Sequence, residues 1–453
     1  MKMTIREIVI ACGGRLLCGD ENTVITSVST DSRQITDGTL FVPIKGGRTD
    51  AHSFINATFA AGAAATLTQN HTEMDDVHPW IAVEDTQRAL QRIAAVYRLR
   101  FLIPVVGITG SVGKTSTKEM VALALSAERN VMKTEGNFNS QIGLPLTMFR
   151  LEPEHEVAVI EMGMSEFGEM ARLAQIAAPQ YAVMTNIGIS HIENLKTREN
   201  ILTEKLHITD AFTEDSVLFL NGDDPMLHAL KGRVTARTVL FGTGEDCDFR
   251  AVNIAPGENG THFDVSIRGV MRHVSLPVFG IHNVLNALAG IAVAQELGVT
   301  PGAAIAALET YQPLAMRQQI HRFNDIIVID DTYNASPDAM KSALSVLVEL
   351  KTEGKAYAVL ADMLELGDYS QRAHYEVGQA VARSGADVLV TVGERAQEIA
   401  RGALSIRPDM ACKVCGANDE AVAFLHTALT KGDVVLVKGS RGMHADEIVK
   451  ALL

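Results

Sequence analysis

The chain has few cysteines and no long apolar run, and each absence excludes a class of protein. Five cysteines among 453 residues are too few for a disulfide framework, so we expect free thiols in a reducing compartment. Cys412 and Cys415 have the spacing of half a zinc site, but no second pair accompanies them. No apolar stretch reaches the roughly 18 residues of a membrane helix. Because residues 1–6 also lack a signal-peptide core, the sequence predicts a cytoplasmic protein with no stable membrane insertion.

Positive charge is scarce as well. Lysine and arginine number 40, aspartate and glutamate 54, and the formal net charge is −14. Nucleic-acid binding depends on Lys and Arg that neutralise phosphates, so this balance argues against a nucleic-acid partner. A small anionic substrate is still compatible with it, because a local cluster of cations can oppose the overall field.

The most informative motif is a glycine-rich loop between an expected strand at 103–106 and an expected helix that includes 120–125. Its residues are Thr109, Gly110, Ser111, Val112, Gly113, Lys114 and Thr115. In such loops the glycines let backbone N–H groups turn toward phosphate oxygens, the lysine reaches the outer phosphates and the threonine ligates Mg²⁺. The sequence therefore predicts a nucleoside-triphosphate site, although Ile108 departs from the strict G-x-x-x-x-G-K-T spacing. The alternative is a chance Gly/Ser turn.

Hydrophobic periodicity divides the chain into three α/β regions, which we expect to be domains over residues 1–84, 85–314 and 315–453. The first begins with an amphipathic helix that ends before Gly13 and continues with short strands such as 39–44. This pattern predicts a small α/β domain at the beginning of the chain.

The middle region alternates strands and helices and then changes to period-two hairpins. Its expected elements are a helix over 86–98, strands at 157–160, 181–184 and 217–220, hairpins over 249–279 and a helix over 282–297. That order predicts a mostly parallel ATPase sheet, covered by helices on both faces, with an antiparallel extension.

The last region returns to alternating strands and helices. Four apolar runs predict buried strands at 326–329, 356–360, 388–392 and 434–437. Buried strands separated by helices are typical of a doubly wound, Rossmann-like sheet. The expected fold class of the whole chain is therefore α/β, in three domains.

Polar side chains follow expected strands of the middle region, where open α/β sheets bind their ligands. Glu161 ends one strand, and His191 and Glu193 follow another. A carboxylate and an imidazole there can complement Thr115 around Mg²⁺. On the residues alone, other roles stay open. Glu161 can be a helix cap or surface group, His191 a loop histidine, and Lys205 a solvated helix residue, which is the role favoured for that lysine.

Taken in order, these motifs resemble the Mur ligase family, the cytoplasmic ATP-dependent amide ligases that build the peptidoglycan stem peptide. The matching segments are 109–115, 135–139, 142–145, 159–163, 186–187, 191–193, Lys205 and 280–287. They extend over nearly the whole chain, so the resemblance applies to all three regions.

Within the family, further segments resemble the ligases that add D-alanyl-D-alanine to UDP-N-acetylmuramoyl-tripeptide. They lie at 29–33, 38–42, 45–46, 330–337 and 437–441. The diaminopimelate-adding relatives usually carry Asp-Asn-Pro-Arg in their last domain, and this chain has no such tetrapeptide. The resemblance therefore implies these two substrates, ATP and Mg²⁺ as cofactors, and a monomer that forms the UDP-muramoyl-pentapeptide.

The resemblance also implies a catalytic set. Lys114 would hold the ATP phosphates together with the rest of the loop, and Thr115, Glu161 and His191 would serve two Mg²⁺ sites. Lys205 would carry a carbamate that supports the second Mg²⁺. Nucleotide contacts would come from Asn283, Asn286, Arg317, Asp331 and Asn334, and substrate contacts from Ser32, Arg33, Lys45, Gly46, Asn137 and Asn139. The alternative for the segment around Ser32 is a charged turn followed by an edge strand.

The implied chemistry first turns a carboxylate into an acyl phosphate and then lets an amine displace the phosphate. Negative charge gathers on phosphoryl and carbonyl oxygens at each step, which favours cations and loop N–H groups over a general base. Two other functions are alternatives. A GTPase-like switch lacks its Asn-Lys-x-Asp or Thr-Lys-x-Asp guanine reader here. A folylpolyglutamate-synthase-like ligase would share the loop and the carbamate but lack a separate uridine-binding front domain.

Overall fold

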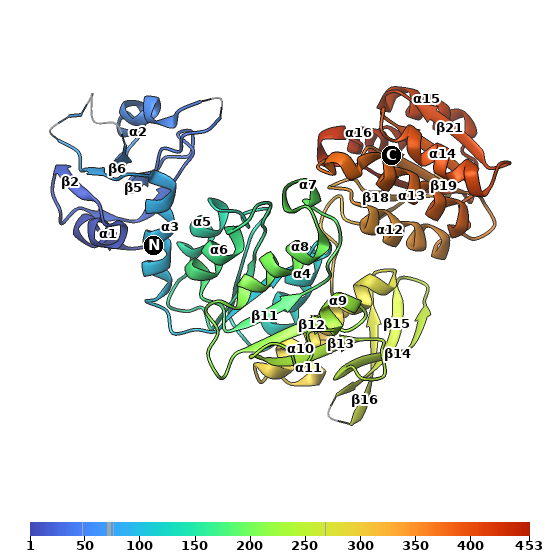
Figure 1. The fold of residues 1–453 in the computed structure, drawn as a ribbon, viewed down its shortest axis with the longest axis horizontal. Coiled ribbons are helices and arrows are strands. Elements are labelled where there is room, and N and C mark those ends of the chain that lie inside the picture. Colours follow the sequence, from blue (N-terminus) through green and yellow to red (C-terminus); the bar gives the residue numbers. More distant parts are fainter. Residues whose placement is uncertain (48, 70–73, 76, 268) are drawn as a thin grey trace.

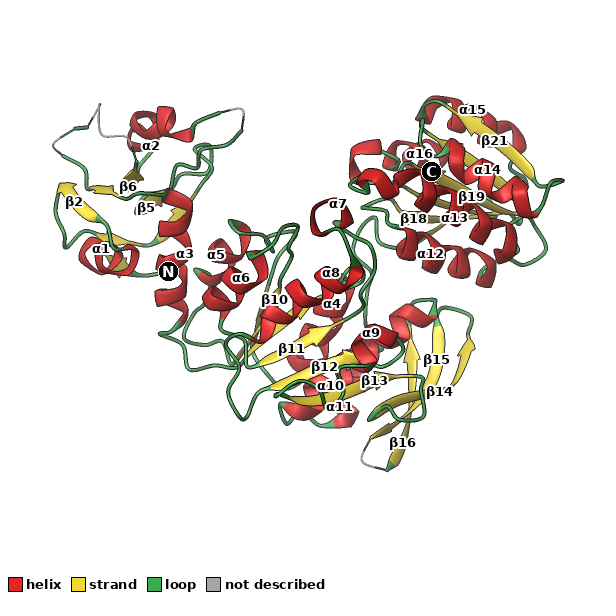
Figure 2. Cartoon of the chain, in the orientation of Figure 1, coloured by secondary structure: helices red, strands yellow, loops and turns green. Residues whose placement is uncertain are grey.

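The chain folds into three lobes, each built around its own main β-sheet (Figure 1). The computed structural model describes residues 1–47, 49–69, 74–75, 77–267 and 269–453. Helices pack around the sheets, most extensively in the second and third lobes (Figure 2). Among the described residues, no helix combines the length and the apolar character needed to cross a membrane. The expected α/β fold class is confirmed.

The first lobe is a small α/β unit. Its five-stranded sheet has the order β2 (Arg15–Cys18), β7 (Trp80–Ala82), β6 (Ala63–Thr68), β5 (Thr39–Phe41) and β4 (Ser27–Ser29), and β1 (Met3–Thr4) pairs separately with β3 (Val24–Ile25). Its helices are α1 (Ile5–Cys12) and α2 (Ile55–Ala60). A capping box between Thr4 and Glu7 begins α1, and Gly13 ends it with a φ of 67°, which residues with a side chain rarely adopt. The predicted helix stop is therefore confirmed.

Helix α3 (Thr86–Arg98) joins the first two lobes and has the bounds predicted from the sequence. It packs against α1 of the first lobe and against α5 (Gly143–Met148) and α6 (Glu169–Ala177) of the second. One cluster of buried apolar side chains runs through both lobes and includes this helix. The domain boundary expected after residue 84 stays a prediction, because α3 belongs to both cores.

The second lobe contains a nine-stranded sheet. In sheet order its strands are β16 (Val270–Leu276), β15 (Thr261–Ile267), β14 (Phe249–Pro256), β13 (Arg237–Gly242), β12 (Val217–Asn221), β11 (Tyr181–Met184), β8 (Val105–Thr109), β10 (Val157–Glu161) and β9 (Val131–Lys133). Neighbouring strands from β14 to β9 in this sheet order, β8 included, pair in parallel. Strands β14, β15 and β16 pair antiparallel. This confirms the predicted parallel sheet with an antiparallel extension.

Helices cover both faces of the parallel strands. Val106 and Ile108 of β8 lie in one apolar cluster with α4 (Lys114–Ser126), α10 (Ile281–Glu296) and α11 (Pro301–Leu308), whereas Val105 lies in the other with α3, α5, α6 and α8 (Arg198–Leu206). Side chains that alternate between two buried faces produce the continuous apolar runs seen in the sequence. Two short helices, α7 (Ile192–Leu195) and α9 (Pro225–His228), follow β11 and β12.

The third lobe is a doubly wound sheet of six strands. Their order is β17 (Gln319–Phe323), β18 (Ile326–Asp331), β22 (Val434–Lys438), β19 (Ala356–Ala361), β20 (Val388–Val392) and β21 (Ala411–Cys415). Only β17 is antiparallel to its neighbour. One face packs against α12 (Pro337–Glu349), α13 (Ser370–Ser384) and α14 (Gln397–Ile406), the other against α15 (Asn418–Ala428) and α16 (Asp446–Leu452). The four predicted strands are confirmed. Sequence reasoning missed β17 and β21, because these edge strands are only partly buried and have no apolar run.

Candidate active site

A cavity of about 690 Å³ lies between the second and third lobes. It opens at the carboxyl ends of parallel strands in both sheets, where open α/β sheets bind ligands. The predicted site residues that line it are Ser111, Val112, Gly113, Lys114, Thr115, Asn137, Asn139, Glu161, His191, Asn283, Asn286, Arg317, Asp331 and Asn334. The fold therefore brings segments from two lobes around one space of small-molecule size.

The glycine-rich loop needs glycine at two positions. Gly110 has a φ of 153° and Gly113 a φ of 84°. A Cβ atom on Gly110 would lie 1.9 Å from Thr185 Oγ1, so any side chain there would clash. Gly113 is the N-cap of α4, whose first residues, Lys114 and Thr115, line the cavity. The positive end of this helix therefore faces the cavity.

Two N–H groups of the loop are already bonded within the protein. Ser111 N–H donates to the Asn186 carbonyl oxygen at 3.1 Å, and Val112 N–H donates to Asn186 Oδ1 at 2.9 Å. Thr185 Oγ1 donates to the Val112 carbonyl oxygen at 2.5 Å. The segment after β11 therefore uses these two N–H groups to hold the loop. Thr109 is fully buried at the end of β8. The N–H groups in the first turn of α4 have no partner within the helix.

Lys205 is a buried amine and not a solvated helix residue. It is 1% exposed, and its Nζ donates to the Gly110 carbonyl oxygen at 3.0 Å. Burial, and then repulsion by Lys114, lower the pKa of Lys205 well below its usual range. Burial also lowers the pKa of Lys114, while Glu161 opposes that shift. The role favoured for Lys205 on the residues alone is therefore wrong, and its amine is disposed to lose a proton.

Glu161 ends β10 inside the site and is neither a helix cap nor a surface group, since it is 2% exposed. Its Oε1 accepts a hydrogen bond from Asn139 Nδ2 at 2.7 Å, and its Oε2 is buried without a partner among the described residues. A buried carboxylate oxygen without a donor is costly, and it is a ligand type that Mg²⁺ prefers. The described part of the chain has no cluster of three His, Cys, Asp or Glu for a metal. A Mg²⁺ ion that keeps waters and phosphate ligands needs no such cluster.

His191 lies at a contact between the second and third lobes. It precedes α7 with a φ of 62°, and its Nδ1 is 3.4 Å from Glu365 Oε2 of the third lobe. This contact lowers the pKa of Glu365. Tyr369 Oη donates to the Lys196 carbonyl oxygen at 3.3 Å nearby. Sequence reasoning missed Glu365, because a contact between separate lobes leaves no local pattern.

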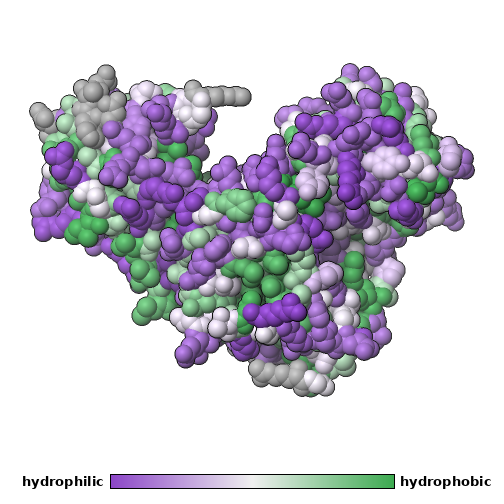
Figure 3. All heavy atoms as spheres, viewed as in Figure 1, coloured by the Kyte–Doolittle hydropathy of each residue, from purple (hydrophilic) through white to green (hydrophobic). Residues whose placement is uncertain are grey.

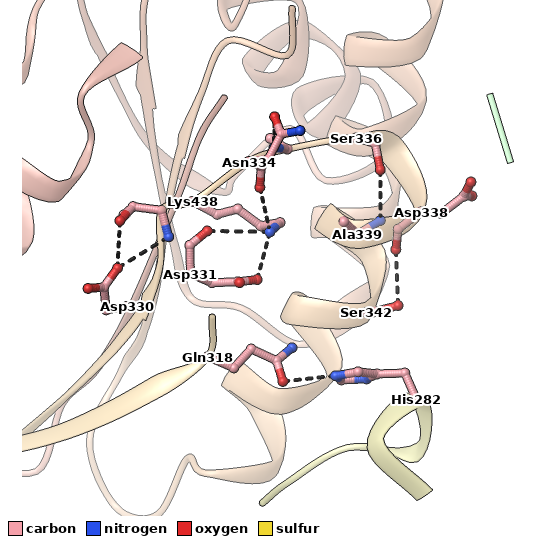
Figure 4. Close-up of polar contacts among 12 residues, drawn as sticks. His282, Gln318, Asp330, Asp331, Asn334, Ser336, Asp338, Ala339, Ser342 and Lys438 are labelled. Carbon is pink, nitrogen blue, oxygen red and sulfur yellow. Dashed lines mark hydrogen bonds and ion pairs between the residues drawn. The ribbon is translucent and has the colours of Figure 1, made fainter. Parts of the chain in front are cut away.

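Asn283 and Asn286 lie one turn apart on α10. Asn286 Nδ2 donates to Asn283 Oδ1 at 3.3 Å, and Thr117 Oγ1 of α4 donates to Asn286 Oδ1 at 2.8 Å. Gln318 Oε1 accepts from Asn283 Nδ2 at 3.2 Å and lies 2.8 Å from His282 Nε2 (Figure 4). These bonds connect the beginning of α10 to α4 and to the segment that enters the third lobe.

The wall from the third lobe carries the other predicted nucleotide residues. The Arg317 guanidinium lies 4.0 Å from the ring centroid of Tyr333, a cation–π geometry. Asp331 Oδ2 accepts from Lys438 Nζ at 2.7 Å, and the Asn334 carbonyl oxygen accepts from the same group at 2.9 Å (Figure 4). Tyr333 and Lys438 were missed as site residues. Their signal was their position at the carboxyl ends of buried strands, since Tyr333 follows β18 by two residues and Lys438 is the last residue of β22.

The residues expected to bind a uridine nucleotide lie in the first lobe and not among the described residues that line the cavity. Arg33 is 87% exposed and pairs with Asp31 at 2.9 Å, next to Ser32. Lys45 and Gly46 are exposed after β5. Strand β5 lies between β4 and β6, so the edge-strand alternative is wrong. The space-filling view is hollowed between the first and third lobes, and hydrophilic residues dominate the visible walls (Figure 3).

Family models match successive parts of the chain. The model of the Mur ligase family catalytic domain matches residues 24–98, that of the Mur ligase middle domain 108–294, and that of the Mur ligase glutamate ligase domain 316–441. Among curated proteins, the UDP-N-acetylmuramoyl-tripeptide–D-alanyl-D-alanine ligase of Bacillus subtilis (strain 168) is 39% identical over 100% of this chain and 99% of its own. The similarity therefore extends over both complete chains.

Solved structures agree with the sequence matches. MurF from Acinetobacter baumannii superposes with a TM-score of 0.92 at 30% identity, over 100% of this chain and 99% of its own. MurF ligase from Thermotoga maritima in complex with ADP gives 0.85 at 30% identity, over 94% and 96%. The Mycobacterium tuberculosis folylpolyglutamate synthase gives 0.64 at 16% identity over 81% and 93%, which shows a shared fold alone. This chain belongs to the Mur ligase family.

Proposed function

We propose that this protein is an ATP-dependent ligase that joins D-alanyl-D-alanine to UDP-N-acetylmuramoyl-tripeptide. The products are the UDP-muramoyl-pentapeptide, ADP and phosphate. The observation that carries the proposal is the cavity between two lobes, in which the first turn of α4 and Glu161 face Arg317 and Asp331. The names of the full-length relatives supply the two substrates.

Nucleotide use is supported by the loop and by the relative solved with ADP. The first turn of α4 offers N–H groups that have no partner within the helix, and Lys114 lies beside them. Asn283 and Asn286 would lie near the base. Arg317, Asp331 and Asn334 would approach the nucleotide from the third lobe, together with the loop residues Thr109, Gly110, Ser111, Val112, Gly113 and Thr115.

Magnesium fits the residues present. Thr115 supplies a hydroxyl, His191 an imidazole, and Glu161 a buried carboxylate oxygen that has no partner among the described residues. When bound, Mg²⁺ would neutralise phosphate charge and orient the transferred group.

Lys205 would complete that set as a carbamate. Its unprotonated Nζ would add to the carbon of CO₂, and the proton lost from nitrogen would pass to solvent. A low pKa favours the unprotonated amine that this reaction needs. The anionic carbamate would also attract the neighbouring Lys114 ammonium and offer oxygen ligands to Mg²⁺.

The bond-forming chemistry follows from the charges around the cavity. A terminal carboxylate oxygen of the tripeptide would attack the γ-phosphorus of ATP, and ADP would leave. The amine of D-alanyl-D-alanine would then attack the acyl carbon, lose a proton and expel phosphate. Lys114 and the positive end of α4 would stabilise the charge that gathers on phosphoryl oxygens. Contacts such as His191 with Glu365 would help keep the lobes closed and exclude water from the acyl phosphate.

The remaining assignments follow the same division of the chain. We propose domains over residues 1–84, 85–314 and 315–453. The first would bind the UDP group and the second ATP, and the third would bind the incoming dipeptide and also contact ATP. Ser32, Arg33, Lys45 and Gly46 would hold the uridine nucleotide, and Asn137 and Asn139 would contact the substrate between the lobes. Because the proposed site comes from one chain and uses ATP, we expect a monomer that works in the cytoplasm.

Phosphate release tests the proposal. The protein is incubated with ATP, Mg²⁺ and UDP-muramoyl-tripeptide, with D-alanyl-D-alanine present or withheld. We expect sustained release only when both cosubstrates are present, together with a product whose mass equals that of the pentapeptide. Release that is indifferent to both cosubstrates would remove the ligase assignment.

A further inference from the structure

Lys438 lies at the carboxyl end of β22, in the middle of the third sheet. It stands opposite Asp331 of β18 on one side and Leu360 of β19 on the other. Its side chain is 4% exposed, and the residue contributes to the cavity wall. It is a buried ammonium at the edge of the proposed nucleotide site.

The hydrogen bonds of this ammonium to described residues go to one short segment. Lys438 Nζ donates to Asp331 Oδ2 at 2.7 Å, to the Asp331 carbonyl oxygen at 3.4 Å and to the Asn334 carbonyl oxygen at 2.9 Å (Figure 4). An ammonium has three N–H donors, and these three acceptors satisfy all of them. Beyond the segment, Ser336 caps α12 by accepting from Ala339 N–H. The Lys438 side chain thus holds the segment between β18 and α12 in place.

The position of the Lys438–Asp331 ion pair at the cavity indicates a role beyond stability. A buried ion pair is weak evidence of net stabilisation, because desolvation offsets the attraction. It does hold a unique geometry, and the geometry held here is that of Asp331 and Asn334, which both line the cavity. An ordinary surface pair, Lys431 with Asp325 at 2.8 Å, joins the turns before the same two strands at the opposite edge.

We infer that Lys438 is a positioning residue for the nucleotide, which acts by holding the 331–334 segment against the cavity. The inference rests on the proposed function, because that function assigns Asp331 and Asn334 to ATP. Lys438 itself need not contact the substrate. Its loss should affect ATP and leave the UDP-linked substrate, which binds through the first lobe, unaffected.

The test compares Lys438→Met with Lys431→Met in the full-length protein. Each variant removes a lysine that pairs with an aspartate at one end of β18, Asp331 as its last residue or Asp325 just before it, but of the two lysines only Lys438 is buried at the cavity. We expect Lys438→Met to weaken ATP binding, measured by titration calorimetry, about tenfold or more, and Lys431→Met to change it less than about twofold. Hydrogen exchange should speed up in the 331–334 backbone of Lys438→Met and stay unchanged in β20.

Lys438→Arg covers the case in which the methionine variant does not fold. It keeps the charge, but a planar guanidinium cannot reproduce the three bonds of an ammonium, so we expect an intermediate loss of ATP affinity with an unchanged KM for the UDP substrate. Wild-type ATP affinity in the folded Lys438 variants would overturn the inference, as would equal losses for ATP and the UDP substrate. A wild-type protein that does not bind ATP would overturn the proposed function and the inference with it.

Discussion

Lys114 and Lys205 donate to the same atom, the carbonyl oxygen of Gly110, at 2.9 and 3.0 Å. Lys114 is the first residue of α4 and Lys205 lies in the last turn of α8, so amines from both helices contact the loop between β8 and α4. Two ammonium groups at this spacing repel each other, and repulsion by Lys114 is the second largest cause of the low pKa of Lys205. We therefore expect the two lysines to have different roles, Lys114 as a cation and Lys205 as an amine that can be modified.

Lys114→Ala should lower kcat about a hundredfold or more. An electrostatic stabiliser at the reacting centre is worth about 2.7–4 kcal/mol in the transition state. Phosphate release under saturating substrates measures the effect. Lys231→Ala, which removes a half-exposed lysine paired with Asp246, is the control and should retain near-normal turnover. If the Lys114 variant turns over within about threefold of wild type, the loop has a structural role only.

Lys205→Ala and Lys205→Arg should both abolish ligation while the fold persists. Alanine has no amine, and an arginine guanidinium stays protonated and cannot form a carbamate. A short carboxylic acid that fills the gap should restore part of the activity to the alanine variant and none to the arginine variant. Ligation assays of both variants, with and without the acid, measure this rescue. An arginine variant with near-normal turnover would show that the second metal ligand lies elsewhere.

Arg33→Ala should weaken binding of the UDP-linked substrate about tenfold without changing ATP affinity, since hydrogen bonds to charged groups are worth about 1.5–3 kcal/mol. The loss of its pair with Asp31 should hardly alter stability, because exposed ion pairs contribute little. Titration calorimetry with each ligand measures both affinities. Arg6→Ala, which breaks an exposed pair with Glu21 in the same lobe, is the matched control. Equal binding by both variants would refute the assignment of the first lobe.

Asp338 should make stability depend on pH. Burial raises its pKa, although Lys341 and Arg198 oppose the shift. The folded state therefore binds this proton more tightly than the unfolded state. The associated stability is present below the ordinary pKa of 3.8 and is lost as the pH rises through the folded-state pKa. Asp338→Asn should accordingly unfold at a higher temperature than wild type at pH 7, with a difference that shrinks as the pH falls toward 4.

Thermal unfolding across that pH range checks the sign. The control is Asp325→Asn, because Lys431 lowers the pKa of Asp325 and removal of that charge should not stabilise the protein. An Asp338→Asn variant that is no more stable than wild type at pH 7 would contradict the burial argument.

Local sequence patterns predicted the helices and strands whose caps and apolar spacing lie within or next to the element itself. Helix α3 has matching bounds because its cap, Asp85, and its apolar spacing both lie within the helix and its flank. The buried parallel strands appear as apolar runs because both of their faces are covered. The partly buried edge strands β17 and β21 have no such run and were missed.

The site was predictable only in part, because several of its features depend on contacts between distant segments. The buried amine of Lys205 donates to Gly110, 95 residues earlier in the chain, and nothing within α8 indicates this contact. The contact of His191 with Glu365 joins two lobes. Asn186, by contrast, lies in one of the matching motifs. Even so, only the folded arrangement shows that Asn186 accepts hydrogen bonds from two N–H groups of the glycine-rich loop.

Oxygen transfer tests the acyl-phosphate route most directly. UDP-muramoyl-tripeptide is labelled with ¹⁸O in its terminal carboxylate and incubated with the protein, ATP, Mg²⁺ and D-alanyl-D-alanine in unlabelled water, and the phosphate released is analysed by mass spectrometry. A carboxylate oxygen that attacks the γ-phosphorus stays with that phosphorus when the amine displaces it. The account therefore predicts one ¹⁸O atom in each phosphate and one in the new amide of the pentapeptide. Phosphate that carries no label while the pentapeptide forms would contradict it.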